Sequence, residues 1–176
     1  MRRFIAFPLA IATACGQVQT EVGSINPPID SGVCEGDLSN IGAGDFRVSF
    51  LIETTQTGWV AVANQRGECN PAVFWDVRLD DGLVYVEVDD IAHYTAITST
   101  GPKVNDGLRH SVRVVRAAGT LTVYVDGSAT GSQGSGASLG ALPPVRLGTD
   151  VCVGAVGDAT VALTGLVIGA CVSRSS

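Results

Sequence analysis

Hydrophobic and polar residues alternate along most of the chain beyond residue 45, which is the pattern of strands with one buried face. The clearest alternating runs lie at residues 46–52, 75–79, 84–88, 110–116 and 121–125. Shorter runs at 145–147, 161–163 and 166–168 bring the expected number to at least eight strands. No stretch keeps a helical period, and turn signals recur about every ten residues. The pattern therefore predicts an all-β antiparallel sandwich.

Three short turn signals join the predicted strands into hairpins. They are Asp81-Gly82, Ala118-Gly119 and Asp126-Gly127. Gly tolerates the positive φ that tight hairpin turns require, and Asp before it does so better than most residues. The stretch 127–140, rich in Ser, Gly and Ala, is predicted to be an edge strand followed by a loop.

Composition narrows the class of partner. The 176 residues are 45% hydrophobic and 16% charged, which suits one globular domain rather than a disordered chain. The formal net charge is -6, and Lys103 is the only lysine. A phosphate or sulfate track needs clustered basic side chains, so nucleic acid, heparin-like polymers and anionic headgroups are excluded as expected partners.

The N-terminus has the features of an export signal. Met1-Arg2-Arg3 precedes an apolar run that is too short to span a bilayer. The run ends at Ala12-Thr13-Ala14-Cys15, which resembles the bacterial lipobox and implies lipidation of Cys15; simple cleavage and secretion is the alternative. We therefore expect an export signal over 1–14, a flexible tether over 15–31 and a sandwich domain over 32–176. The protein is expected at the outer membrane as a lipoprotein, or secreted to the cell surface.

Two segments at a fixed spacing, 105–112 and 119–127, resemble the paired signature of laminin G-like domains. These belong to the concanavalin A-like lectin and glucanase superfamily, and the resemblance covers about 34–172. It implies a jelly roll of two curved antiparallel sheets in which the first and last strands are neighbours. Arg109 replaces the usual Trp. Val167 and Ile168 replace acidic residues of a segment that often contributes to a calcium site in that family.

Four cysteines remain after Cys15, and an even number in an exported chain predicts two disulfides. Four cysteines allow three pairings. The topology that the resemblance implies favours Cys34 with Cys171, joining the first and last strands, and Cys69 with Cys152, joining two loops. The alternative pair, Cys152 with Cys171, would close a terminal hairpin.

An enzymatic role is not expected. Glucanases of this superfamily carry Glu-x-Asp-x-Glu, or a variant with one added residue, because glycoside hydrolysis needs two carboxylates. Here Glu87 and Asp89 begin the pattern, but Ile91 and Ala92 stand where the last Glu should be. A residual glycosidase, the least favoured hypothesis, would depend on Glu87.

The favoured hypothesis is a non-catalytic extracellular module that recognises carbohydrate or a glycosylated surface through loops at one edge of the sandwich. The alternative is a protein-interaction or structural adhesion module of the same fold. The residues expected to bind the ligand combine one aromatic ring with polar groups: Asn64, Arg66, Asp89, Asp90, His93 and Tyr94. Calcium is the one cofactor considered, with Asp150 and Asp158 as expected ligands because carboxylate oxygens suit that ion.

Overall fold

The computed structural model describes residues 40–69, 71–155 and 158–174. The predicted export signal, the tether, Cys15 and Cys34 lie outside these residues. All regular structure in the described ranges is β-strand. The described residues contain no helix that is long and apolar enough to cross a membrane.

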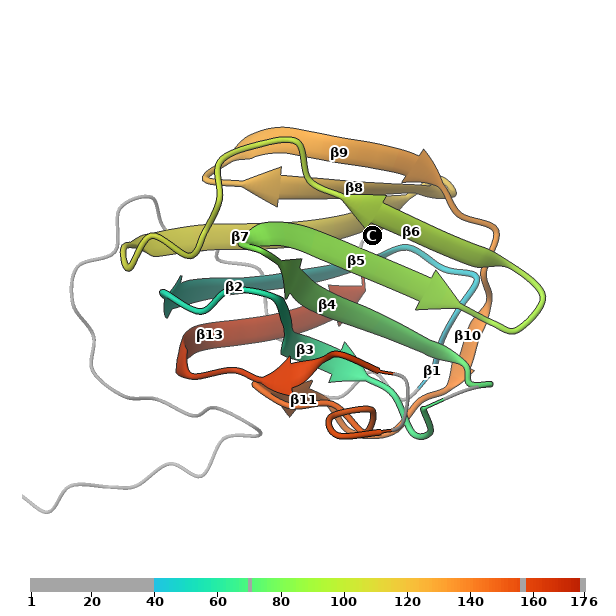
Figure 1. Cartoon of the computed structure of the whole chain (residues 1–176). Coiled ribbons are helices and arrows are strands. Elements are labelled where there is room, and N and C mark those ends of the chain that lie inside the picture. Colours follow the sequence, from blue (N-terminus) through green and yellow to red (C-terminus); the bar gives the residue numbers. More distant parts are fainter. Residues whose placement is uncertain (1–39, 70, 156–157, 175–176) are drawn as a thin grey trace, which may run out of the picture.

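Two sheets form the two layers of a sandwich, as Figure 1 shows. The six-stranded sheet has the order β11-β3-β4-β5-β6, and β12 also pairs with β3. Its strands are β3 (Trp59–Gln65), β4 (Phe74–Asp80), β5 (Leu83–Asp89), β6 (Tyr94–Thr98), β11 (Arg146–Leu147) and β12 (Val161–Ala162). All its pairings are antiparallel except the two-residue contact of β12 with β3.

The five-stranded sheet has the order β13-β2-β7-β8-β9 and is antiparallel throughout. Its strands are β2 (Phe46–Thr54), β7 (Arg109–Ala117), β8 (Thr120–Val125), β9 (Ser128–Gly134) and β13 (Gly165–Arg174). Two short strands, β1 (Asn40–Gly42) and β10 (Leu139–Ala141), pair separately. The pairing of β2 with β13 confirms that the first and last long strands are neighbours, and β9 confirms the predicted edge strand.

The core lies between the sheets and is built from the apolar positions of the alternating runs. Trp75, Val77 and Leu79 of β4 face Phe46, Val48 and their neighbours across the sandwich, and all are buried. Trp75 donates from Nε1 to Oε1 of Gln65 at 2.7 Å, so its polar edge is satisfied inside the core. The predicted assignment of Trp75 to the core is confirmed.

The predicted hairpin turns have the left-handed backbone that their sequences favour. Asp81 and Gly82 have φ values of 47° and 88°, and Asp126 and Gly127 have values of 50° and 80°. Two consecutive positive φ values match the right-handed twist of the flanking strands. The turns therefore fix the registers of β4 with β5 and of β8 with β9.

Arg116 is a buried cation at the end of β7. It shares the core-facing side of the strand with Val112 and Val114, and its side chain donates to the carbonyl oxygens of Gly42, Gly44 and Ala137. Its guanidinium carbon lies 4.9 Å from the centroid of the Phe46 ring. Burial lowers the pKa of this arginine. Arg116 thereby joins the loop before β2 to the segment that precedes β10.

The strands β6 and β9, at the top of Figure 1, run side by side where the two sheets meet. Thr100 donates to the carbonyl of Thr130 from its backbone nitrogen at 2.7 Å and from its hydroxyl at 2.9 Å. Thr95 donates from its hydroxyl to the carbonyl of Gly134 at 3.3 Å. An added Cβ at Gly131 would lie 2.7 Å from a side-chain carbon of Ile97, so only glycine allows this approach. We call this contact the β6–β9 seam.

His110 links two turns at one end of the sandwich. Its Nδ1 lies 2.7 Å from Oδ2 of Asp126, and its Nε2 lies 3.0 Å from Oδ1 of Asp106. Partial burial lowers the pKa of His110, but hydrogen bonds to the two carboxylates outweigh that effect and the pKa is raised. The imidazolium is therefore favoured in the folded state.

Because the folded-state pKa of His110 is above its unfolded value, its contribution to stability is fully present below about pH 6.5. That contribution is lost as the pH rises through the raised folded-state pKa. In His110→Gln, the loss in free energy of unfolding should be larger at pH 5.5 than at pH 8.5. Urea denaturation at both values measures this, and equal losses would contradict it. Asp126→Asn, which removes one partner, should weaken the same pH dependence.

Cys69 and Cys152 form a disulfide with a Cα–Cα distance of 4.9 Å. This pair was predicted, and it excludes the alternative bridge between Cys152 and Cys171. Cys171 is also in a disulfide. Its predicted partner, Cys34, lies outside the described residues, so that pairing stays a prediction.

Candidate functional site

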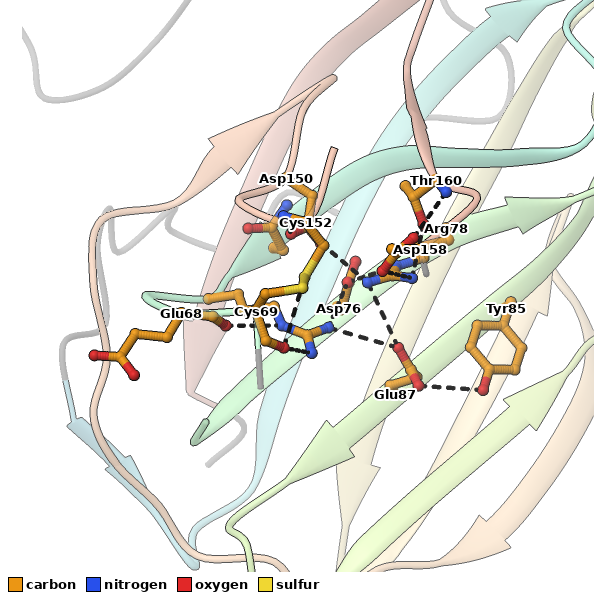
Figure 2. Close-up of polar contacts among 12 residues, drawn as sticks. Glu68, Cys69, Asp76, Arg78, Tyr85, Glu87, Asp150, Cys152, Asp158 and Thr160 are labelled. Carbon is orange, nitrogen blue, oxygen red and sulfur yellow. Dashed lines mark hydrogen bonds and ion pairs between the residues drawn. A yellow bond between two sulfur atoms is a disulfide. The ribbon is translucent and has the colours of Figure 1, made fainter. Parts of the chain in front are cut away.

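The polar positions of β3, β4 and β5 lie on the outer face of the six-stranded sheet, opposite the core. Two covering segments lie over part of this face, residues 66–69 and the described residues of a second segment, 148–155 and 158–164; the Cys69–Cys152 disulfide joins them. Beneath this cover lies a set of six charged side chains, drawn in part in Figure 2. We call it the polar cluster; its members are Arg66, Asp76, Arg78, Glu87, Asp150 and Asp158.

Arg78 is the centre of the polar cluster. Its Nε donates to Oδ2 of Asp76 at 2.8 Å, its Nη2 lies 3.2 Å from Oδ2 of Asp150, and its Nη1 lies 3.7 Å from Oδ2 of Asp158. Burial disfavours its charge, but Asp76 and the neighbouring carboxylates outweigh burial and the pKa of Arg78 is raised. The arginine therefore stays charged beneath the covering segments.

Asp76 is the most enclosed carboxylate of the cluster. Desolvation raises its pKa well above the usual value, and a hydrogen bond shared with Asp150 adds to this, although Arg78 acts in the opposite direction. The pKa of Asp150 is lowered, because hydrogen bonds from Asp76 and from the backbone nitrogen of Cys152, together with Arg78, outweigh its burial. Asp76 therefore keeps its proton to a higher pH than Asp150 does.

Three aromatic rings border the polar cluster on the same face, and we call them the aromatic patch: Trp59, Tyr85 and Tyr94. The rings of Trp59 and Tyr85 meet edge to face with centroids 4.9 Å apart. The hydroxyl of Tyr94 donates to Oε1 of Glu87 at 2.6 Å and lies 2.9 Å from the hydroxyl of Tyr85. Desolvation and the bond to Glu87 raise the pKa of Tyr94, so the phenol stays neutral. The residue is nonetheless 56% exposed.

Four of the six predicted binding residues are close together in and beside the turn between β5 and β6. Asp90 accepts from the backbone nitrogens of His93 and Ser138 at 2.6 and 2.8 Å, and its Oδ2 lies 3.1 Å from Nδ1 of His93. The bond from Ser138 and those from His93 lower the pKa of Asp90 to about 2. Asp89 accepts from the nitrogen of Ile91 at 2.6 Å. With Tyr94, these residues form one exposed corner of the molecule.

The other two predicted binding residues do not lie on this corner. Asn64 is 0% exposed and donates to the carbonyl of Thr149 at 2.7 Å. Arg66 stacks over the ring of Phe74 at 3.8 Å and donates to the carbonyls of Glu68 and Cys69. Both side chains are inside because the 66–69 loop and residues 146–149 lie over the end of β3. Both side chains therefore support the outer face of the six-stranded sheet from inside and are not exposed to a ligand.

The predicted calcium ligands, Asp150 and Asp158, are brought together, but Arg78 lies against a carboxylate oxygen of each. Ligand atoms of Cys69, Cys152 and Asp158 also lie within 4.8 Å of one another. Because both sulfurs are in the disulfide, they are not thiolate ligands. A cation between Asp150 and Asp158 would have to displace the guanidinium.

A groove of about 560 Å³ follows the β6–β9 seam. Its lining combines small side chains with hydroxyls and one amide, and it contains no charged residue: Ala96, Ile97, Thr98, Thr100, Ala129, Thr130, Gly131, Ser132 and Gln133. Ala96 and Thr98 are the second and fourth residues after Tyr94 on β6, so their side chains point to the same face of the sheet as the Tyr94 ring. The groove therefore adjoins the aromatic patch.

Sequence analysis missed Asp76 and Arg78 as members of a site. Their only local signal was the alternation of opposite charges, Asp76 and Arg78, along the outer side of β4. Their partners Asp150 and Asp158 lie more than seventy residues further along the chain. No local pattern connects the two segments.

The architecture defines a class: an all-β jelly-roll sandwich with a polar cluster and exposed aromatic rings on one outer face. Residues 53–168 match the family model of the laminin G domain, which is more than half of the chain. The protein therefore belongs to the laminin G domain family.

A solved laminin structure agrees on the fold. Domains LG4-5 of the mouse laminin alpha1 chain superpose with a TM-score of 0.61 at 18% identity, covering 80% of this chain and 37% of that chain. The receptor-binding domain of botulinum neurotoxin D matches with a TM-score of 0.49 at 14% identity, covering 62% of this chain and 31% of that chain. This protein thus spans little more than a third of the laminin structure. No match was found among curated proteins.

Proposed function

We propose that this protein is an exported, non-catalytic binding module that recognises neutral carbohydrate through Tyr94 and the adjoining groove. The observation that carries the proposal is the exposed ring of Tyr94, held in place by Glu87 and set beside Asp89 and Asp90. Export is supported by the disulfide between Cys69 and Cys152. Lipidation of Cys15 is part of the proposal and would anchor the module to a membrane.

A sugar ring has an apolar face and a border of hydroxyls, so a site for it combines an aromatic platform with planar polar groups. Tyr94 supplies the platform, and its hydroxyl is already used by Glu87, which fixes the ring's orientation. Asp89 and Asp90 supply carboxylates beside the ring, and Gln133 with the threonines of the groove supplies neutral partners. The absence of charged residues from the groove lining favours a neutral ligand over a sulfated or sialylated one.

Glu87 serves as an anchor in this proposal rather than as an acid or nucleophile. One of its oxygens accepts from Tyr85 and Tyr94, and the other lies 3.9 Å from both Arg66 and Arg78. Asp89, the next acid of the incomplete glucanase pattern, accepts from the backbone of its own turn. Hydrolysis of a glycosidic bond requires two carboxylates free to act as acid and nucleophile, and these contacts already engage both Glu87 and Asp89.

The test is an array of neutral, sulfated and sialylated glycans probed with the disulfide-bonded protein. We expect neutral glycans to bind and Tyr94→Ala to weaken that binding about five- to thirtyfold, because one stacked ring contributes about 1–2 kcal/mol. Tyr94→Phe keeps the ring and should bind within about threefold. Tyr124→Ala, on β8 of the other sheet, is the matched control and should leave binding unchanged. Binding that survives Tyr94→Ala would contradict the proposal.

A protein-interaction module is the second candidate function. Three aliphatic side chains on β11, β12 and the start of β13 are exposed: Leu147, Val161 and Leu166. An array that stays blank with and without calcium would favour this candidate.

A further inference from the structure

Ile91 has a backbone conformation that residues of its type rarely adopt. Its φ is 76°, and the described residues other than glycine with a positive φ are Asp81, Ile91, Ala118 and Asp126. Of these four, Ile91 is the one branched at Cβ, which makes it a steric outlier. Each of the other three precedes a glycine in a hairpin turn, whereas Ala92 follows Ile91. The local sequence therefore does not account for the conformation of Ile91.

Side-chain hydrogen bonds hold the turn around Ile91 in this conformation. Asp89, the last residue of β5, accepts from the backbone nitrogen of Ile91 at 2.6 Å. Asp90 accepts from the backbone nitrogens of Ala92 and His93 at 3.0 and 2.6 Å. A branched residue in the left-handed region strains the backbone, and the strain persists only where surrounding contacts fix it. Asparagine adopts the same conformation with less strain, so the turn itself does not require isoleucine.

The side chain of Ile91 is also exposed and close to the proposed sugar platform. Ile91 is 65% exposed, in the turn that joins β5 and β6 at one end of the six-stranded sheet (Figure 1). Asp89 and Tyr94 are the last register pair before this turn, so Ile91 is three residues from the Tyr94 ring. An exposed aliphatic side chain adds nothing to the core, and at this position it strains the turn. What it offers is an apolar contact to a ligand.

The surroundings of Ile91 indicate which ligand can use this contact. A plain sugar is bordered by hydroxyls, and an aliphatic side chain gives a hydroxyl no hydrogen-bond partner. A methyl substituent, as in a 6-deoxy sugar or an N-acetylated sugar, is stabilised by burial against such a side chain. The groove beside Tyr94 is lined by small and hydroxyl-bearing side chains and no charged residue, which suits an uncharged sugar.

We propose that Ile91 determines specificity in the carbohydrate site by binding a methyl substituent of a neutral sugar whose ring stacks on Tyr94. This inference rests on the proposed function, because it takes Tyr94 as the platform. It narrows the class of ligand to neutral sugars that carry a methyl group, either at a 6-deoxy position or on an N-acetyl group. In the complex, burial of the Ile91 side chain offsets the strain of its backbone.

Two pairs of immobilised sugars, placed on the glycan array, test the class of ligand. L-fucose has a methyl group where L-galactose has a hydroxymethyl group, and N-acetylglucosamine has a methyl group that N-formylglucosamine lacks. We expect the disulfide-bonded protein to bind the methyl-bearing sugar of at least one pair about fourfold more tightly, as burial of one methyl group predicts. The pair that shows the preference identifies the source of the methyl group.

The array separates failure of this inference from failure of the proposed function. Equal binding within both pairs, or binding only to neutral glycans that carry neither methyl group, would overturn the inference alone. A protein that binds no neutral glycan would overturn both.

Two substitutions at Ile91 separate its role in binding from its role in folding. Ile91→Asn removes the apolar contact and relieves the backbone, so it should abolish the preference within the pair and raise the Tm by about 3 °C. Ile91→Val keeps a branched aliphatic side chain and should keep the preference within about twofold. If Ile91→Asn keeps the preference or lowers the Tm, the inference is overturned.

Two control variants match the two features of Ile91 at other turns. Ala118→Asn relieves a positive φ in the turn between β7 and β8, so it should raise the Tm without changing the preference. Leu108→Asn removes an aliphatic side chain that is also 65% exposed, next to the start of β7, and should leave the preference unchanged. Loss of the preference in either control would show that the effect is not specific to Ile91 and would overturn the inference.

Discussion

Replacing Arg116 by leucine is expected to lower the free energy of unfolding by about 3–5 kcal/mol. The guanidinium donates to three carbonyls, those of Gly42, Gly44 and Ala137, and it lies over the ring of Phe46. Leucine fills part of the space but donates nothing, and each buried acceptor left without a donor costs about 1–3 kcal/mol. Gly44 is exposed, so water takes over part of that loss.

Urea denaturation followed by tryptophan fluorescence measures the change. Arg116→Lys should fall between the wild type and leucine, because an ammonium group cannot span three carbonyls. Arg109→Leu is the matched control at the other end of the same strand. Arg109 is exposed and lies 3.4 Å from Glu53, so its loss should cost less than about 1 kcal/mol. Equal losses at the two positions would show that Arg116 does not hold the segments together.

Removing the Cys69–Cys152 disulfide is expected to cost about 4 kcal/mol. The two cysteines are 83 residues apart in sequence, so the bridge excludes many conformations of the unfolded chain. It also holds the segment that carries Asp150 against the loop that carries Arg66. The double variant Cys69→Ala with Cys152→Ala isolates this bridge, whereas a reducing agent would also break the one at Cys171.

Two measurements separate the effects of this disulfide. Urea denaturation gives the overall loss, and a value below about 1 kcal/mol would contradict the chain-entropy argument. Hydrogen exchange at the backbone nitrogen of Cys152, which donates to Asp150, reports local opening of the cover. In the double variant, we expect exchange at the backbone nitrogen of position 152 to be faster than in the wild type. Exchange in β7, which lies in the centre of the other sheet, should change less.

Much of the fold could be predicted from local pattern, because strand alternation and turn chemistry act over a few residues. Trp75, Val77 and Leu79 alternate with charged residues, and the structure buries them in the core. Asp81-Gly82 predicted a hairpin, and its φ values are positive as that turn requires. The paired signature around residues 105–127 indicated the laminin G fold, which the family match confirms.

Arg116 shows where strand alternation and side-chain charge disagree. Alternation places it on the core side of β7, whereas its charge argues for the surface, and the structure buries it because three carbonyls converge on it. Asn64 and Arg66 fail in the opposite way. Their polarity predicted an exposed rim, but a segment about eighty residues further along the chain covers them. Local sequence carries no signal for such cover, so of the six residues predicted to bind a ligand only the four of the β5–β6 corner lie together near the surface.

The β6–β9 seam bears on how closely copies of this protein can be packed. A strand at the edge of a sheet normally presents unpaired backbone groups to which a strand of another molecule can add. Here the two edge strands face each other, and Thr100 and Thr95 donate to carbonyls of β9. Along this side, few backbone groups of the edge strands are therefore free to pair with a strand of another molecule and begin edge-to-edge aggregation.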